Sequence, residues 1–197
     1  GTARAGLLIG AFFSAEFLFL FNALDLTSVT RASVIFYTMP VWMALACRVV
    51  LPDQRFSARG WIGLAFALVG VLVALVARED LSEGALLGDI LALCAAGCWA
   101  GIALTARASA LRHVPAEVQL SWQVGVSAIV LLLVSPLFGP YLRDAELIHV
   151  ASLAVQAVVV VAFGFAVWLW LLARYPAAQV AAFGFLTPIF GVAFGWL

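Results

Sequence analysis

The sequence has few charges and no lysine. Ten arginines balance ten acidic residues, so only 10% of the 197 residues are charged, while 66% are apolar. A soluble domain is roughly half apolar and about one quarter charged, so this composition argues against an ordinary soluble protein. Zero net charge and the lack of a basic cluster give no support to a nucleic-acid partner. The lipid bilayer is therefore the expected solvent.

Cysteine and histidine are also scarce. Cys47, Cys94 and Cys98 lie within apolar stretches at spacings that match no metal site, which is typical of packing residues. His113 and His149 lie in connections on opposite sides of the membrane, and neither a catalytic set nor a glycine-rich phosphate loop is recognisable. We expect no enzyme, no metal and no cofactor. The sequence has no initiator Met and no signal-peptide pattern, and both of its ends look cut.

Long apolar runs are what the sequence has in abundance. A helix needs about 20 apolar residues to cross the hydrocarbon core. Strands of a membrane barrel would be about half as long and would alternate polar with apolar residues, which these runs do not. The sequence therefore predicts an all-α, polytopic bundle of transmembrane helices. The seven predicted spans are residues 5–24, 32–47, 60–77, 90–106, 118–137, 150–173 and 175–197.

The arginines predict the orientation of the bundle. Connections between successive spans fall on alternating sides, and seven arginines lie on one side against three on the other. The positive-inside rule places the richer side in the cytoplasm. The first side holds Arg4, Arg48, Arg55, Arg59, Arg107, Arg112 and Arg174, and the second holds Arg31, Arg78 and Arg143. The first span is then expected to run from inside to outside.

An internal repeat is the strongest pattern within the spans. Tyr37 to Val41 and Phe185 to Ile189 share an aromatic residue followed three positions later by Pro40 or Pro188, and the flanking hairpins match over about forty residues. The two copies are five spans apart, so they lie in opposite orientations. Inverted repeats are typical of secondary transporters. Each proline is expected to kink or break its helix, although such prolines are also tolerated as ordinary membrane kinks.

The hairpin NALDLTSVTRASVIFYTMPVWMAL, followed by GWIGLAFALVGVLVAL and GDILALCAAGCWAGIAL, resembles the EamA-type transporters of the drug/metabolite transporter superfamily. That family has ten helices in two inverted five-helix repeats, with both termini cytoplasmic. The resemblance implies that the seven spans are the third to ninth helices. Residues 1–80 would be the C-terminal part of the first repeat, with three helices. Residues 81–197 would be the second repeat without its last helix, because the family's Gly-Glu turn after the ninth helix is missing here.

Glu16 is the sharpest candidate for a functional group in the membrane. It lies about eleven residues, or roughly 17 Å, into the first span, near the bilayer midplane. Placing a carboxylate there costs about 2.5 to 3.5 kcal/mol on insertion scales, so something should compensate for it. One reading is a proton, cation or amine site. The other is a protonated or backbone-bonded side chain within helix packing.

Other candidates carry less chemistry. Gln119, Trp122, Gln123 and Ser127 share one face of the fifth span, and Gln123 is the one most expected to face a polar cavity. Aromatic residues at mid-span are candidates to line a solute pocket, although such residues more often form bundle core. The remaining candidates are Asn22, Tyr37, Trp99 and Phe185. On the external connection, Arg31 and Asp25 could pair, although a solvated pair there contributes little to stability.

These patterns together predict a secondary transporter with a small-molecule solute site at the centre of the bundle. The resemblance favours export of amino acids or related amphiphilic metabolites across the inner membrane, coupled to protons. The alternative is a non-transporting membrane scaffold or sensor component. A scaffold should pack Glu16 and Gln123 dry, whereas a transporter should line a solvent-reaching space with them. Substrate, direction and oligomeric state are left open.

Overall fold

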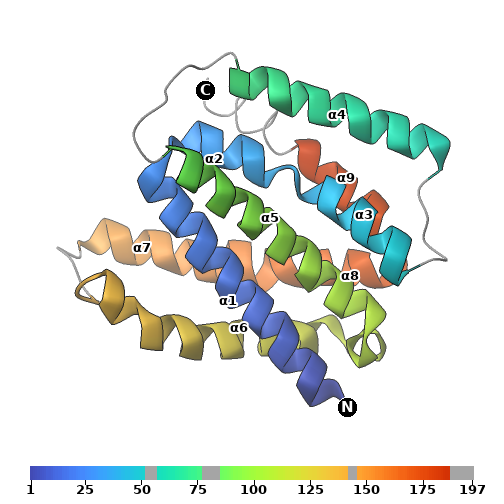
Figure 1. Ribbon diagram of the computed structural model, residues 1–197. Helices are drawn as coiled ribbons and strands as arrows, with labels where there is room; N and C mark the ends of the chain where they lie inside the picture. Colours follow the sequence, from blue (N-terminus) through green and yellow to red (C-terminus); the bar gives the residue numbers. More distant parts are fainter. Residues whose placement is uncertain (52–56, 77–84, 142–145, 187–197) are drawn as a thin grey trace.

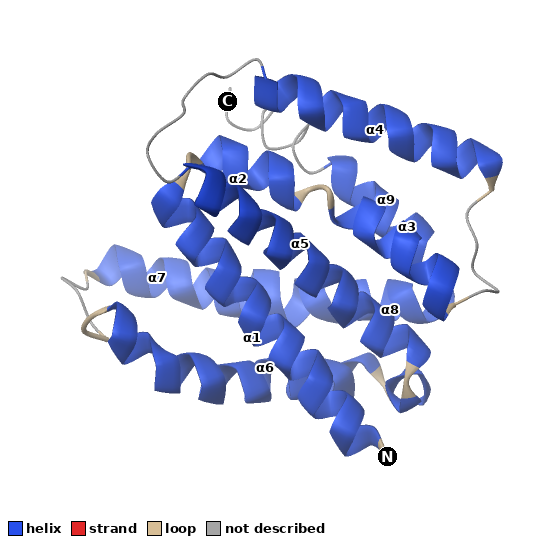
Figure 2. Ribbon diagram, viewed as in Figure 1, coloured by secondary structure: helices blue, strands red, loops and turns tan. Residues whose placement is uncertain are grey.

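The computed structural model describes residues 1–51, 57–76, 85–141 and 146–186. Every regular element among these residues is a helix (Figure 2). Five helical segments are long and apolar enough to cross a membrane: Thr2–Leu26, Val29–Val50, Ala85–Ala108, Ala116–Phe138 and Leu147–Arg174. This confirms the predicted all-α polytopic bundle.

The observed helices correspond to the predicted apolar runs, with shifted ends. The first half contains α1 (Thr2–Leu26), α2 (Val29–Phe36), α3 (Met39–Val50) and α4 (Ala58–Val76). The second half contains α5 (Ala85–Ala108), η2 (Ala110–His113), α6 (Ala116–Val134), η3 (Ser135–Phe138), α7 (Leu147–Val155), η4 (Gln156–Phe165), α8 (Ala166–Arg174), α9 (Ala177–Ala182) and η5 (Phe183–Leu186). Helix η4 has π geometry and joins α7 and α8 into one long span (Figure 1).

Helix α1 lies between α5 and α6, and glycines set how closely these helices approach (Figure 1). A Cβ atom on Gly6 or Gly10 would overlap Trp122 or Val126 of α6, so the two helices run parallel. On α5, a Cβ atom on Gly101 would lie 2.9 Å from the ring of Phe12. Missing side chains therefore allow the close backbone contacts that membrane bundles use.

The second predicted span is broken in the middle. Helix α2 ends at Phe36. Just beyond it, the Oγ1 atom of Thr38 donates a hydrogen bond to the carbonyl oxygen of Ile35, in the last turn of α2, at 2.7 Å. Helix α3 then begins at Met39 with Pro40 in its first turn. A proline is tolerated there because the first amide groups of a helix have no partner within the helix.

The seventh predicted span leaves α-helical geometry at the corresponding place. Helix α9 ends at Ala182 and gives way to the 3-10 turn η5, directly before Thr187. Pro188 lies outside the described residues. Both copies of the predicted repeat therefore depart from α geometry just ahead of the proline position. The division into repeats at residues 80 and 81 remains a prediction.

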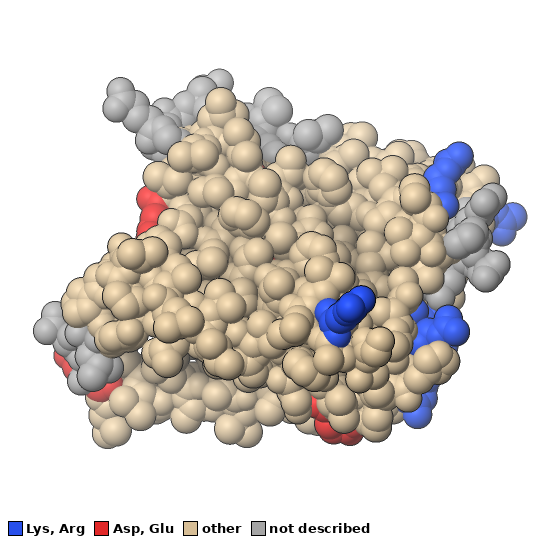
Figure 3. Space-filling view, turned by 60° about the horizontal axis from the view of Figure 1, so that its bottom comes forward, with Lys and Arg blue, Asp and Glu red and all other residues tan. Residues whose placement is uncertain are grey.

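Arginines gather at one end of the bundle. Helices α3, α5 and α8 each carry an arginine in their last turn, namely Arg48, Arg107 and Arg174, where a cation also complements the helix dipole. Most of the blue side chains in Figure 3 lie toward this end, hereafter the arginine end. Arg55, Arg78 and Arg143 lie outside the described residues. The cytoplasmic assignment of this end remains a prediction.

Arg31 does not pair with Asp25, the partner that the sequence suggested for it. Arg31 of α2 instead binds Asp89 of α5, with its Nη2 atom 2.6 Å from the Oδ2 atom of Asp89. Asp25 lies on α1, in the turn that ends the helix, and forms no ion pair with a described residue. Tertiary packing brings the start of α5 next to the start of α2. Residues this far apart in sequence cannot be paired from neighbouring positions alone.

Candidate solute-binding cavity

The two interrupted segments meet where their helices change geometry. Helix α3 packs on α9, and a Cβ atom on Gly184 of η5 would overlap the terminal methyl group of Met39. Met39 is the first residue of α3, directly after the break in the second span. The absence of a side chain at Gly184 is therefore what lets the two break regions touch.

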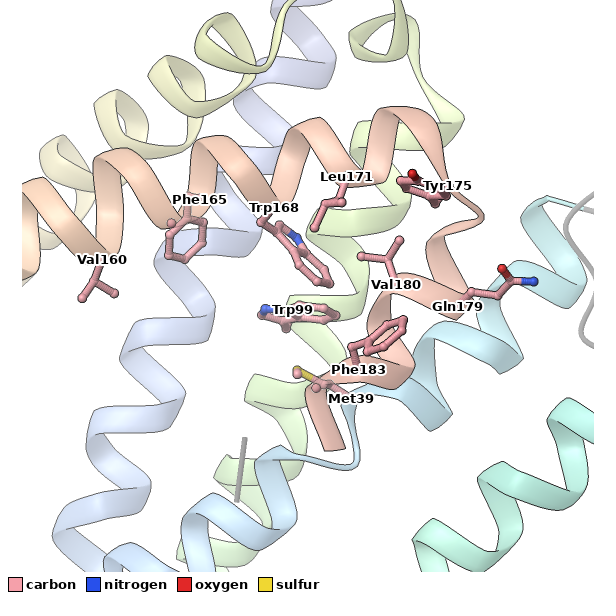
Figure 4. Close-up of a pocket in the computed structure, with 12 residues that line it drawn as sticks. Met39, Trp99, Val160, Phe165, Trp168, Leu171, Tyr175, Gln179, Val180 and Phe183 are labelled. Carbon is pink, nitrogen blue, oxygen red and sulfur yellow. The ribbon is translucent and has the colours of Figure 1, made fainter. Parts of the chain in front are cut away.

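A cavity of about 830 Å³ lies beside this contact, between α3, α5, α8 and α9 (Figure 4). This volume is within the range of pockets that bind small organic molecules. Aromatic side chains form much of the wall: Trp99, Phe165, Trp168, Tyr175 and Phe183. The rest of the lining consists of Met39, Val160, Gly164, Leu171, Gln179, Val180 and Gly184.

A pair of indole rings forms the centre of the wall. The rings of Trp99 and Trp168 have centroids 4.8 Å apart and planes inclined by 50°. Phe165 is held by an edge-to-face contact with Phe13 of α1, with centroids 5.3 Å apart. Such aromatic contacts fix ring orientation as well as burying area. The wall facing the cavity is therefore a defined aromatic surface supplied by two different spans.

The lining carries no charged side chain among the described residues, and its polarity is uneven along its length. Tyr175 and Gln179 lie at one end, next to Arg174, while Val160 lies at the other (Figure 4). The guanidinium group of Arg174 itself stacks on Trp170, 4.0 Å from the ring centroid. The cavity is thus polar toward the arginine end and apolar toward the opposite end.

Glu16 is packed away from this cavity. Its side chain is only 6% exposed, and its Oε2 atom has no hydrogen-bond partner among the described residues. Cys98 of α5 lies close enough to interact with it electrostatically. Cys98 directly precedes Trp99, which lines the cavity.

The other predicted site residues occupy different places. Gln123 is fully buried and neither of its amide atoms has a described hydrogen-bond partner, but it does not line the cavity. Asn22 lines a separate, smaller cavity, and Tyr37 packs on Phe36 with ring centroids 6.1 Å apart. The side chain of Phe185 lies outside what the structure describes. Trp99 is the predicted residue that does line the larger cavity.

Sequence reasoning missed the face of the sixth predicted span. Gly164, Trp168 and Leu171 recur at helical spacing and line the cavity, and Tyr175, the first residue of the seventh predicted span, continues this spacing. The same span also carries Phe163 and Trp170 on its exposed side. Aromatic residues thus occur all around this helix, so periodicity alone did not distinguish the cavity face from the outward face.

No metal centre is evident in the described part of the chain, where no group of three or more His, Cys, Asp or Glu side chains converges. The described cavity offers aromatic faces, a few hydrogen-bonding groups and no nucleophile beside a base. Aromatic faces and hydrogen-bonding groups of this kind are suited to binding a solute.

Comparisons with known proteins agree with this description. The family model of the EamA-like transporter family matches residues 2–76 and 86–197. A Salmonella typhimurium protein named "Probable amino-acid metabolite efflux pump" is 26% identical over 187 residues, which cover 90% of this chain and 62% of that protein. An Escherichia coli protein of the same name is 26% identical over 190 residues, covering 91% and 62%.

An Archaeoglobus fulgidus protein named "Uncharacterized transporter" is 25% identical over 183 residues, covering 91% of this chain and 62% of that protein. The chain therefore spans 62% of the length of these curated relatives. No solved structure gives a significant match. The family match extends over both halves of the chain and includes every helix that lines the cavity. The chain belongs to the EamA-like transporter family and is a multi-pass membrane protein.

Proposed function

We propose that the full-length protein is a secondary transporter that exports small organic metabolites across the inner membrane. The observation that carries this proposal is the uncharged, aromatic-walled cavity of about 830 Å³ beside the contact between the two helix breaks. Solute sites of secondary transporters lie where interrupted helices of inverted repeats meet. Met39 comes from the first predicted repeat and the other lining residues come from the second.

The lining favours neutral or zwitterionic solutes with an apolar or aromatic part. Transferring an unpaired ion into an uncharged cavity carries a large desolvation penalty. The indole rings of Trp99 and Trp168 provide apolar surface, while Tyr175 and Gln179 supply hydrogen-bonding groups for a polar head. Amino acids and related amphiphilic metabolites have this character. The names of the two bacterial relatives agree with that class.

Transport would proceed by alternating access. In this proposal residues 1–80 and 81–197 belong to two inverted repeats that rock about the cavity. The interruptions at Tyr37 and Thr38 and at η5 are suited to such motion because they lack the continuous hydrogen-bond ladder of an α-helix. The cavity lies beside both interruptions, so a change of angle at either one would alter its shape.

Glu16 is the group that we assign to proton coupling. It is an acidic residue held within a membrane-spanning helix, and its Oε2 atom lacks a hydrogen-bond partner among the described residues. Ionising a buried carboxyl group that has no partner is costly, so the loss of its proton would favour a conformation in which Glu16 is better solvated. The path from Glu16 to the cavity would run through Cys98 and Trp99 on α5.

A scaffold or sensor component is the alternative function. The positions of Glu16 and Gln123 favour the scaffold function, because both side chains are buried and neither lines the aromatic cavity in the described structure. The aromatic cavity favours transport, because a purely structural bundle has no need for a void of that size. The two functions differ in whether a solute crosses the membrane.

The decisive experiment is flux through the full-length protein in proteoliposomes. A panel of neutral, acidic and basic amino acids and metabolites is offered with and without an imposed pH gradient. We expect accumulation of neutral or zwitterionic solutes with apolar side chains, and faster accumulation with the gradient. Absence of flux for every solute, in protein shown to be folded, would favour the scaffold function. Flux that is the same with and without the pH gradient would support transport but contradict proton coupling.

A further inference from the structure

A second cavity lies between the ends of α1 and α6, at the opposite end of α1 from Arg4. It has a volume of about 380 Å³. Because α1 and α6 run parallel, the last turns of both helices lie at the same end of the bundle, and η3 follows α6 directly (Figure 1). The cavity is therefore separate from the aromatic cavity and shares no lining residue with it.

The polar groups of this second cavity are rich in hydrogen-bond acceptors. Asn22 donates from Nδ2 to the carbonyl oxygen of Leu18 at 2.7 Å, which leaves its Oδ1 atom available. Ser135 donates a hydrogen bond from Oγ to the carbonyl oxygen of Leu132 at 3.3 Å. The lone pairs of this Oγ atom can still accept a hydrogen bond from a ligand. Asp25 adds a carboxylate, which can only accept when ionised.

The carboxylate of Asp25 has no cation to neutralise it among the described residues. Arg31, the arginine that the sequence suggested as its partner, donates hydrogen bonds to both carboxylate oxygens of Asp89 instead. Asn22 and Asp25 are three positions apart on α1, so their side chains lie on the same face of the helix. Among the described residues, the cavity therefore combines a carboxylate that has no ion-pair partner with two neutral acceptors.

Apolar side chains form the remainder of the wall. Leu18 and Phe21 come from α1 on the same face as Asn22, and Phe138 comes from η3. A ligand that satisfies this lining must offer several hydrogen-bond donors and a positive charge at one end. It must also offer an apolar chain or ring at the other.

We infer that this second cavity binds the ammonium group of a small amphiphilic amine, with Asp25 as its counter-ion and Asn22 and Ser135 as neutral acceptors. A protonated primary amine carries three N–H donors, which matches three acceptors. Its apolar part lies against Phe21 and Phe138. An aminophospholipid head group presents the same ammonium chemistry as a soluble amine, and the experiment below separates the two sources.

The test is direct binding to the full-length protein in phosphatidylcholine nanodiscs, whose head groups have no N–H donor. Hexylamine at neutral pH is titrated by calorimetry, with hexanol as the uncharged probe of equal chain length. We expect saturable binding of hexylammonium and weaker binding of hexanol. Asp25→Asn should weaken hexylammonium binding about tenfold or more, as expected for loss of a hydrogen bond to a charged group.

Glu117→Gln is the matched control, because Glu117 is an exposed carboxylate in the first turn of α6, at the opposite end of that helix from the second cavity. We expect it to leave hexylammonium binding unchanged. Asp25 is exposed, so Asp25→Asn should keep the thermal unfolding profile of the unaltered protein. Equal binding by Asp25→Asn and the unaltered protein, or equal binding of hexanol and hexylammonium, would overturn the assignment.

Nanodiscs containing phosphatidylethanolamine identify the source of the ammonium group. Weaker apparent binding of hexylammonium in these discs, lost in Asp25→Asn, would show that a lipid head group occupies the cavity. Equal binding in both kinds of disc would show that the ligand is a soluble amine. Both outcomes support an ammonium site, and neither depends on the proposed transport activity because only binding is measured.

Discussion

Arg31 and Asp89 join helices α2 and α5 through a two-pronged ion pair across 58 positions of sequence. The Nε atom of Arg31 lies 2.8 Å from Oδ1 of Asp89, and Nη2 lies 2.6 Å from Oδ2. The two side chains are 20% and 16% exposed, so the pair is partly buried. It connects the first predicted repeat to the second, at the end of the bundle away from the arginine end. Two hydrogen bonds between a guanidinium and a carboxylate group fix the relative orientation of the two side chains as well as attracting them.

The ion pair should contribute measurably to stability. Arg31→Ala and Asp89→Ala should each lower the thermal unfolding temperature in detergent, and the double variant should lose less than the sum. We expect a coupling free energy of about 1 kcal/mol, as measured for pairs near a protein surface. Asp25→Ala is the control and should have little effect, because Asp25 forms no ion pair with a described residue. Additive single effects would show that the pair is not energetically coupled.

Gly101 and Gly97 should respond differently to the same substitution. A Cβ atom on Gly101 would press on the ring of Phe12, whereas one on Gly97 would meet no other group within 4 Å. Gly101→Ala should therefore reduce the free energy of unfolding by about 1 to 3 kcal/mol through overpacking. Gly97→Ala should be neutral or slightly stabilising because alanine favours helix. Equal unfolding curves for the two variants would contradict the packing of α5 on α1.

Trp168 should matter for solute flux far more than Trp170, its neighbour on α8. Trp168 lines the aromatic cavity beside Trp99, while Trp170 is 46% exposed and stacks on Arg174. Trp168→Ala should raise the KM for the exported solute about tenfold, which corresponds to ~1.4 kcal/mol of lost binding. Trp170→Ala should leave KM near that of the unaltered protein. The same change in KM for both variants would show that the aromatic cavity is not where the solute binds.

Glu16→Gln should uncouple transport from protons. Glutamine has nearly the same shape as glutamic acid but cannot release a proton, so flux driven by a pH gradient should be lost. Solute exchange without a gradient should persist, because the aromatic cavity is unchanged. Glu117→Gln serves as the control for removing an exposed carboxylate. Gradient-driven flux at the level of the unaltered protein would remove Glu16 from the coupling mechanism.

Gln123 and Gln119 provide a matched pair on α6. Gln119 donates to the carbonyl oxygens of Leu111 and Val114 at 2.9 and 3.3 Å, whereas Gln123 has no described hydrogen bond and is fully buried. Gln119→Met should reduce the free energy of unfolding by about 1 to 3 kcal/mol because it removes two hydrogen bonds, of which the one to Leu111 is buried. Gln123→Met should be neutral or stabilising. Destabilisation by Gln123→Met would reveal a partner for its amide group, such as a buried water.

The candidate site was only partly predictable from the sequence. The transporter interpretation predicted that Glu16 and Gln123 line the cavity, because polar groups in membrane helices often mark solute pathways. Whether a residue faces a cavity depends on the rotation of its helix about its own axis, and this rotation is set by packing against neighbours. The close contacts at Gly6, Gly10 and Gly101 orient α1, α5 and α6 and leave Glu16 between helices.

The sequence by itself determined the solvent, the helical class and the approximate ends of the spans. These properties depend on local composition, because the bilayer sets the length of an apolar helix and excludes unpaired backbone groups. It also indicated the break at Pro40, because proline disrupts a helix through its own covalent geometry.

Only the tertiary structure decided which residues meet. It paired Arg31 with Asp89 rather than Asp25, placed Trp168 beside Trp99, and brought Gly184 against Met39. All three contacts join segments far apart in the chain. Hydrophobic patterning defines each helix separately, but several packings of the same helices satisfy it equally. Side-chain size and fit at the helix contacts select one of these packings, and that selection positions the cavities.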